Sequence, residues 1–114
     1  MKVLELGTDL DLDGPGATSG TALDLADGSY AAPFLPNYTV IAVGVVVGYA
    51  EDAEGALTIE GREATADSYV VLFTAGPGAA PLKMAEITLQ RFIRYTLTSA
   101  TAADGRGSVY LLGN

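Results

Sequence analysis

The amino-acid sequence predicts an all-β domain: a two-sheet antiparallel sandwich of about eight short strands, jelly-roll-like in type. Three observations predict it. The two strongest apolar runs, Thr39–Tyr49 and Ser68–Thr74, are rich in β-branched and aromatic residues, which fit a pleated sheet better than a helix. Clusters of Gly, Asp and Pro separate the apolar runs at short intervals. No segment gives a confident helix.

The 114 residues suit one domain with a single core, preceded by a segment of different composition. We expect residues 1–20 to form an acidic, partly mobile N-terminal arm or edge segment, and residues 21–114 to form the sandwich. Lys2–Leu6 alternates weakly and fits a short edge strand, whereas Gly7–Gly20 is crowded with Gly, Asp, Ser and Thr and fits a loop or arm. A segment of this composition is expected to become ordered on a partner.

The next stretch leads into the predicted central strand. Thr21–Leu25 alternates briefly, Asp27-Gly28 is a turn signal, and residues 30–37 carry two prolines that favour an irregular, extended connection. Thr39–Tyr49 then forms the central strand. Its odd-numbered positions are almost all large and apolar and are assigned to the core. Its even-numbered positions are mainly Ala, Gly and Val, so we expect another layer or subunit to lie close against that face.

Three further strands follow from local patterns. Ala56–Glu60 alternates with its apolar residues on one face. Ser68–Thr74 is predicted to be the neighbour of the central strand in the core, and the Gly-Pro-Gly cluster after it ends the strand. Ser108–Leu112 closes the chain as the final strand.

Apolar and polar residues also alternate over 86–98, but Arg91 falls on the apolar face and Phe92 on the polar face. That inversion predicts a bulge or corner at this point, which divides the run into two strands. A helix over 81–95 is the competing interpretation. It is disfavoured because Glu86 would lie in its apolar stripe and because the β-branched content is high.

Composition and charge exclude several functions. Without Cys or His the chain lacks thiolate chemistry and the usual general base, and we predict no catalytic residue, metal site or cofactor. A net charge of −8 argues against nucleic acid as a partner. No segment has the length of a transmembrane helix or the pattern of a signal peptide, so we expect no membrane partner and a chain that stays in the compartment where it is made.

Asp9, Asp11 and Asp13, followed by Gly14, match the opening D-x-D-x-D-G pattern of a calcium loop, in which carboxylates converge on one hard cation. The closing ligand is missing, because Gly20 stands where the loop needs a bidentate Glu. We therefore favour a solvated acidic loop. Calcium binding completed by ligands from elsewhere is the alternative, and it predicts a higher melting temperature in millimolar calcium.

Arg91 is the second candidate, because a guanidinium on an apolar strand face must find a carboxylate or carbonyl groups, or reach an interface. We expect an ion pair within or between subunits, with Glu86, Glu60 and Glu63 as the candidate partners. Arg91 and Arg94, together with the three aspartates above, make up the predicted partner-binding residues.

Arg91–Thr98, followed after a turn by Gly107–Gly113, resembles the closing hairpin of small β-sandwich proteins from tailed bacteriophage particles. The resemblance covers about a fifth of the chain, turn included, and is a pattern of residue types with no invariant motif. Size, acidity, the absence of Cys and His, and a sequence rich in Gly and Ala are similar to those of capsid decoration, or cement, proteins of that class.

The resemblance implies a non-enzymatic virion structural protein, a jelly-roll or sandwich homotrimer that is made in the host cytoplasm and stabilises the capsid surface by binding the major capsid protein. The alternative is a carbohydrate- or ligand-binding β-sandwich domain of a phage fibre or adhesin, which would need an exposed cluster of aromatic and carboxylate residues in one concave place. An enzyme is disfavoured because no credible pair of catalytic acids is evident.

Overall fold

The structure is a computed structural model that describes residues 1–11, 16–47, 55–75, 82–99 and 105–114. These residues contain nine strands and no helix, hence none of the length and apolarity needed to cross a membrane. The strands are β1 (Lys2–Asp11), β2 (Gly16–Ser19), β3 (Leu23–Asp24), β4 (Thr39–Val47), β5 (Gly55–Arg62), β6 (Val70–Ala75), β7 (Leu82–Thr88), β8 (Phe92–Ser99) and β9 (Arg106–Gly113). The all-β prediction is confirmed.

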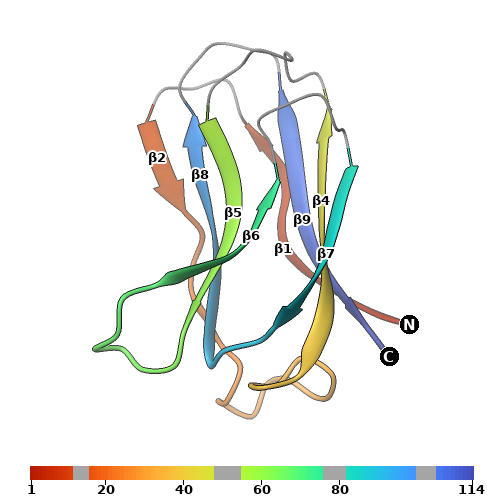
Figure 1. Cartoon of the computed structure of the whole chain (residues 1–114), viewed down its shortest axis with the longest axis vertical. Helices are drawn as coiled ribbons and strands as arrows, with labels where there is room; N and C mark the ends of the chain where they lie inside the picture. Colours follow the sequence, from red (N-terminus) through yellow and green to blue (C-terminus); the bar gives the residue numbers. More distant parts are fainter. Residues whose placement is uncertain (12–15, 48–54, 76–81, 100–104) are drawn as a thin grey trace.

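Eight strands form two antiparallel sheets that pack face to face, with the orders β1-β9-β4-β7 and β2-β8-β5-β6, while the two-residue β3 pairs with β8 (Figure 1). The pairs β1–β9, β2–β8, β4–β7 and β5–β6 are nested, as in one long hairpin. The hairpin is rolled up, so that β9 also pairs with β4 and β8 with β5. This arrangement is that of a jelly roll, and the predicted two-sheet sandwich of about eight strands is confirmed.

The core lies between the two sheets. The four-stranded sheet contributes inward-facing residues from β4 and β9, and the opposite sheet contributes Leu57, Ile59, Phe73, Ile93 and Leu97. Leu25 and Phe34, from the long connection between β3 and β4, are buried in the same cluster. That connection is irregular, as its prolines predict.

The structure reverses the predicted faces of the central strand β4. The even-numbered positions, predicted to be covered by another layer, face the core: Val40, Ala42, Gly44 and Val46. The odd-numbered positions, predicted to form the core, lie on the opposite face of the sheet: Ile41 and Val45 are half-buried there, and Val43 is only 8 % exposed between its strand neighbours. The assignment by size was wrong because a central strand is apolar on both faces, so side-chain size does not reveal which face meets the other sheet.

The small residues of β4 do lie against a close second layer, which is the other sheet of the same chain. A Cβ atom at Gly44 would collide with the Cβ of Ala75 and come within 3.2 Å of the ring of Phe73. The closest approach of the two sheets therefore requires a residue without a side chain at this position.

The corner predicted within 86–98 is also confirmed. β7 ends at Thr88 and β8 begins at Phe92, and the two strands lie in different sheets. The backbone of Leu89 between them donates to Tyr38 O at 2.8 Å and accepts from Asn37 N at 2.8 Å. The competing helix is wrong, because residues 82–88 and 92–99 are paired in sheets.

The N-terminal segment is more regular than its composition predicts. β1 pairs with β9 and β2 with β8, each as an edge strand of its sheet. The loop or arm expected over Gly7–Gly20 is therefore wrong for residues 7–11 and 16–19, and residues 12–15 lie outside the described part. Apolar residues of β1, among them Leu6 and Leu10, pack against the core and offset the polar character of the segment.

Three other strands can be compared with their predictions in length or position. The strand expected at Thr21–Leu25 is only the two-residue β3, and the one expected at Ala56–Glu60 extends to the eight residues of β5. β6 pairs with β5 in the other sheet and lies against β4 across the core, so it is the neighbour of the central strand in the core, as predicted, but not its partner within a sheet. Positions 48 and 49 of the predicted central strand lie outside the described residues.

Candidate functional site

The outer surface of the four-stranded sheet is largely apolar. Strand register brings side chains together in three rows that cross the sheet in the order β1, β9, β4 and β7. The first row is Val3–Leu112–Ile41–Glu86, and the second is Glu5–Tyr110–Val43–Met84. The third row has no β1 member and is Ser108–Val45–Leu82. We define the outer apolar face by the large apolar residues of these rows: Val3, Ile41, Val43, Val45, Leu82, Met84, Tyr110 and Leu112.

Several of these side chains are open to solvent. Val3 is 57 % exposed, and Leu82 and Met84 are each 55 % exposed. The exposed large apolar residues of this surface lie on both edge strands of one sheet face, and grouped apolar residues of this kind are candidates for contact with a partner. The acidic members of the three rows, Glu5 and Glu86, lie at the β1 and β7 sides of the patch. The patch therefore carries one glutamate on each of its two edge strands, beside apolar residues of the same strands.

A pocket of about 390 Å³ lies where β4 begins and β9 ends, at one end of the outer apolar face. Ile41, Leu112 and Glu86 belong to both the face and the pocket wall. Tyr38, which is 44 % exposed, adds an aromatic ring to the lining. The pocket thus combines apolar walls with one carboxylate and one aromatic ring in a single concave place.

Gly113 shapes another wall of this pocket. A Cβ atom there would collide with the ring of Pro33 and come within 3.4 Å of Val40. Any side chain at this position must therefore displace Pro33, which also lines the pocket.

The predicted acidic residues lie at the far end of β1. Asp9 and Asp11 flank Arg106 of β9, at 4.0 Å from its Nε and 3.8 Å from its Nη1, respectively. Asp13 lies outside the described residues. Within the described part of the chain, no three acidic side chains converge closely enough to hold a metal ion. Calcium binding and partner binding by these aspartates stay predictions.

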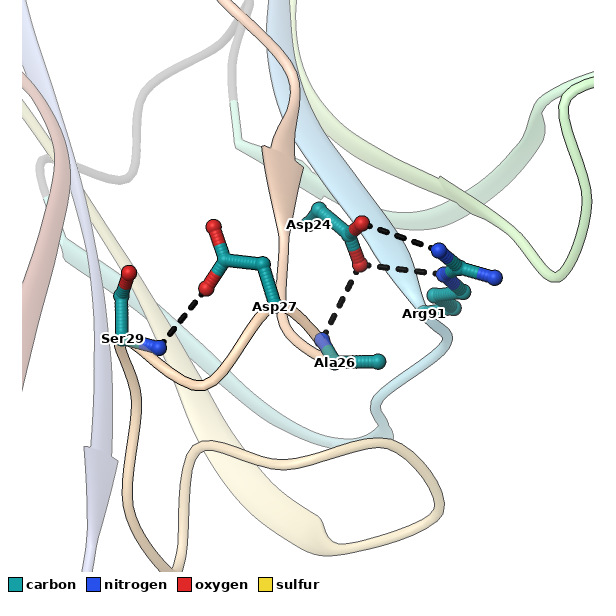
Figure 2. Close-up of polar contacts among 5 residues, drawn as sticks. All are labelled: Asp24, Ala26, Asp27, Ser29 and Arg91. Carbon is teal, nitrogen blue, oxygen red and sulfur yellow. Dashed lines mark hydrogen bonds and ion pairs between the residues drawn. The ribbon is translucent and has the colours of Figure 1, made fainter.

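Arg91 forms the expected ion pair, but with a different partner. Its Nε and Nη2 donate to the two carboxylate oxygens of Asp24, each at 3.0 Å, and the Ala26 N–H donates to the same carboxylate at 3.0 Å (Figure 2). Because Arg91 and the Ala26 N–H stabilise the charged carboxylate, the pKa of Asp24 is lowered, and the pKa of Arg91 is raised in turn. The candidate partners Glu86, Glu60 and Glu63 were wrong, because the pairing of β3 with β8 places Asp24 beside the corner.

The turn after β3 is held by a second aspartate, seen beside this pair in Figure 2. Asp27 accepts the backbone N–H of Ser29 at 2.7 Å, the bond of an Asx turn. Gly28 between them has φ of +92°, which favours glycine. The turn signal Asp27-Gly28 is confirmed.

Arg94 lies on the outer surface of the second sheet, paired with Glu60. Its Nε donates to Oε1 of Glu60 at 3.1 Å, and its guanidinium carbon lies 3.7 Å from the centroid of the Tyr69 ring. Arg62 lies 4.3 Å from the same centroid and donates through Nη1 to the carbonyls of Thr65 and Asp67. These contacts fix the β5–β6 hairpin. A partner role for Arg91 or Arg94 stays a prediction.

Sequence reasoning missed the outer apolar face because the faces of β4 were assigned in reverse. The signal that could have found it is the spacing of Leu82 and Met84, two large apolar residues that alternate with Lys83 and Ala85 in the segment that becomes β7. The pocket could not be found from local pattern. It forms where residues 33–41 meet Glu86 and the end of β9, which are far apart in the sequence.

Comparison of the chain with protein-family models, with curated proteins and with solved structures finds no match.

Proposed function

We propose that this chain is a non-enzymatic structural protein that docks onto a larger protein assembly through its outer apolar face. The observation that carries the proposal is the contiguous apolar patch on β1, β9, β4 and β7, in which Leu82 and Met84 remain 55 % exposed. Covering such a patch releases apolar surface from water, and this supplies most of the free energy of protein association.

The size of the patch suits the centre of an interface. At about 4.8 Å between strands and 3.3 Å per residue, the apolar rows cover about 15 Å across the sheet and about 13 Å along β4. A stable interface buries roughly 800 Å² on each partner, so the residues around the patch also belong to the docking surface. The glutamates on its two edge strands, in a chain of net charge −8, fit a partner whose complementary surface is apolar in the middle and basic at the edge.

The proposed partner is the major capsid protein of a tailed bacteriophage, and the proposed location is the capsid surface. The similarity of the residue pattern over 91–98 and 107–113 to that of capsid decoration proteins supports this choice. The closing hairpin expected from that pattern is wrong, because β8 and β9 lie in different sheets and do not pair with each other. Jelly rolls occur in viral capsid domains and also in lectins, so the fold agrees with the choice without deciding it. The apolar face supplies what a decoration protein needs, namely a rigid surface that is buried on a partner.

The test uses particles of the encoding phage that were assembled without this protein. Met84→Lys places a charge on the β7 side of the outer apolar face, at one of its most exposed positions, without touching the core. We expect the variant to fold normally but to lose about tenfold in affinity for the particles. Occupancy is measured by co-sedimentation of chain and particles over a concentration series.

Val71→Lys is the matched control. Val71 is 53 % exposed, close to the 55 % of Met84, but lies on β6 of the other sheet. This variant should bind the particles as the natural chain does. Equal binding by both variants would rule out the outer apolar face as the docking surface, and no binding by the natural chain would rule out the capsid as partner.

A further inference from the structure

We propose that the pocket at the end of the outer apolar face receives one arginine side chain of the docking partner. This inference rests on the proposed function, because the pocket and the face share Ile41, Leu112 and Glu86. A partner that covers the face with an interface of ordinary size also covers the mouth of the pocket. A projecting side chain of that partner would enter it.

The lining of the pocket matches the two parts of an arginine side chain. Pro33, Ile41 and Leu112 provide apolar walls for the aliphatic stem. The carboxylate of Glu86 and the ring of Tyr38 lie in the same lining and are the two groups that bind a guanidinium best, by charge-assisted hydrogen bonds and by stacking on the ring face. At about 390 Å³, the pocket is within the size range of ligand sites.

Glu86 is free to accept such a ligand. Within the described part of the chain it forms no ion pair, whereas Glu60 is paired with Arg94 and Asp24 with Arg91. Its strand neighbour across β4 is Ile41, so the carboxylate stands beside apolar surface. An unpaired carboxylate in such surroundings interacts favourably with an added cation once water is excluded.

Elsewhere in the chain, one arginine contacts both a carboxylate and an aromatic ring. Arg94 lies between Glu60 and Tyr69, with 3.1 Å from its Nε to the carboxylate oxygen and 3.7 Å from its guanidinium carbon to the ring centroid. Glu86 and Tyr38 provide the same two groups without the arginine. Lysine fits less well, because its compact ammonium group is strongly hydrated and cannot donate two parallel hydrogen bonds while stacking flat on a ring.

The test is a titration of the isotope-labelled full chain, followed by NMR, with the capped peptide acetyl-Gly-Arg-Gly-amide. We expect saturable shifts of the amide signals of Tyr38, Ile41 and Glu86. The same peptide with citrulline in place of arginine has nearly the same shape but no charge, and should bind at least about tenfold more weakly. Glu86→Gln should weaken binding of the arginine peptide by a similar factor.

Glu63→Gln is the matched control, because Glu63 is an exposed glutamate on the β5–β6 hairpin and its change alters the net charge equally. It should leave the affinity unchanged. Equal binding of the arginine and citrulline peptides, or an equal effect of the two Glu→Gln variants, would overturn the proposal. So would shifts at the pocket with N-acetylglucosamine or galactose but none with the peptide, which would favour the carbohydrate-binding alternative.

The two proposals fail separately. Loss of particle binding in Met84→Lys, together with no response to the arginine peptide, would keep the docking surface and remove the arginine site. Binding of the peptide by a chain that does not attach to particles would keep the arginine site and remove the capsid as the docking partner.

Discussion

Gly44 shows at the scale of one residue how close the two sheets lie. A Cβ atom at Gly44 would collide with the Cβ of Ala75. Gly44→Ala therefore forces the backbone of one of the two strands, β4 or β6, to move. Overpacking of this kind costs about 1–3 kcal/mol of unfolding free energy. Urea unfolding of the variant and the natural chain measures the difference.

A second substitution tests the cause. Ala75→Gly removes the atom that the new methyl group meets, so the double variant Gly44→Ala/Ala75→Gly should recover part of the loss in Gly44→Ala. A double-mutant cycle gives the coupling energy between the two sites. If the two effects simply add, the loss comes from the backbone of β4 and contact between the sheets is not its cause.

The ion pair of Asp24 and Arg91 gives a pH-dependent contribution to stability. The pKa of Asp24 is lower in the folded chain than its ordinary value, mainly because of Arg91, so folding favours the charged carboxylate. The contribution is therefore present above about pH 4, the range where a free Asp is ionised, and is lost as the pH falls through the folded-state pKa. Asp24→Asn should lower the urea midpoint at pH 7, and its effect should become smaller as the pH falls below about 4.

Asp27→Asn is the control for that comparison. It removes the same charge from the same turn, and its amide oxygen can still accept the Ser29 N–H, but Asp27 has no contact with Arg91 in Figure 2. The effect of Asp27→Asn on the urea midpoint should not show the decrease at low pH that is expected for Asp24→Asn. The same pH profile in both variants would mean that Arg91 is not the cause.

At the scale of elements, local pattern predicted most strands because β-branched runs and Gly, Asp and Pro turns act over a few residues. It also predicted the β7–β8 corner from the misplaced Arg91. It failed where the deciding contact is distant. The faces of β4 depend on which side meets Ala75, and the partner of Arg91 depends on the pairing of β3 with β8. The pocket depends on three separate segments and had no local signal at all.

The N-terminal strand β1 gives the clearest test at this scale. Leu4, Leu6 and Leu10 of β1 pack against the core, and burial of a leucine contributes about 1.5–3 kcal/mol when complete. Deletion of residues 1–11 also exposes the edge of β9, which invites aggregation. Since domains are stable by only about 5–15 kcal/mol, the truncated chain should be largely unfolded or aggregated at 25 °C.

Circular dichroism and light scattering of the truncated chain measure this outcome. Val3→Lys is the control, because Val3 faces outward on the same strand and is 57 % exposed, and this variant should melt as the natural chain does. A soluble, cooperatively melting truncated chain would show that the segment is an arm whose removal the sandwich tolerates.

At the scale of the whole molecule, the outer apolar face and the net charge have opposite effects on self-association. The outer apolar face favours association with any apolar surface, including a second copy of the chain. The net charge of −8 opposes self-association, because every copy carries the same excess of acids. The homotrimer proposed from the family resemblance must therefore overcome a repulsion that docking onto a basic-edged partner does not meet.

Salt should separate these two kinds of association. Screening over about 10 Å at 0.1 M weakens both the repulsion between copies and the attraction to a basic border. Raising salt from 0.05 to 0.5 M should therefore strengthen self-association in sedimentation equilibrium, while it slows attachment to undecorated particles by about tenfold or more. Glu5→Gln should reduce the salt dependence of attachment, because it removes an acidic group from the border of the outer apolar face. Attachment that is equally fast at both salt concentrations would mean that the partner presents no basic border, and that apolar contact alone selects it.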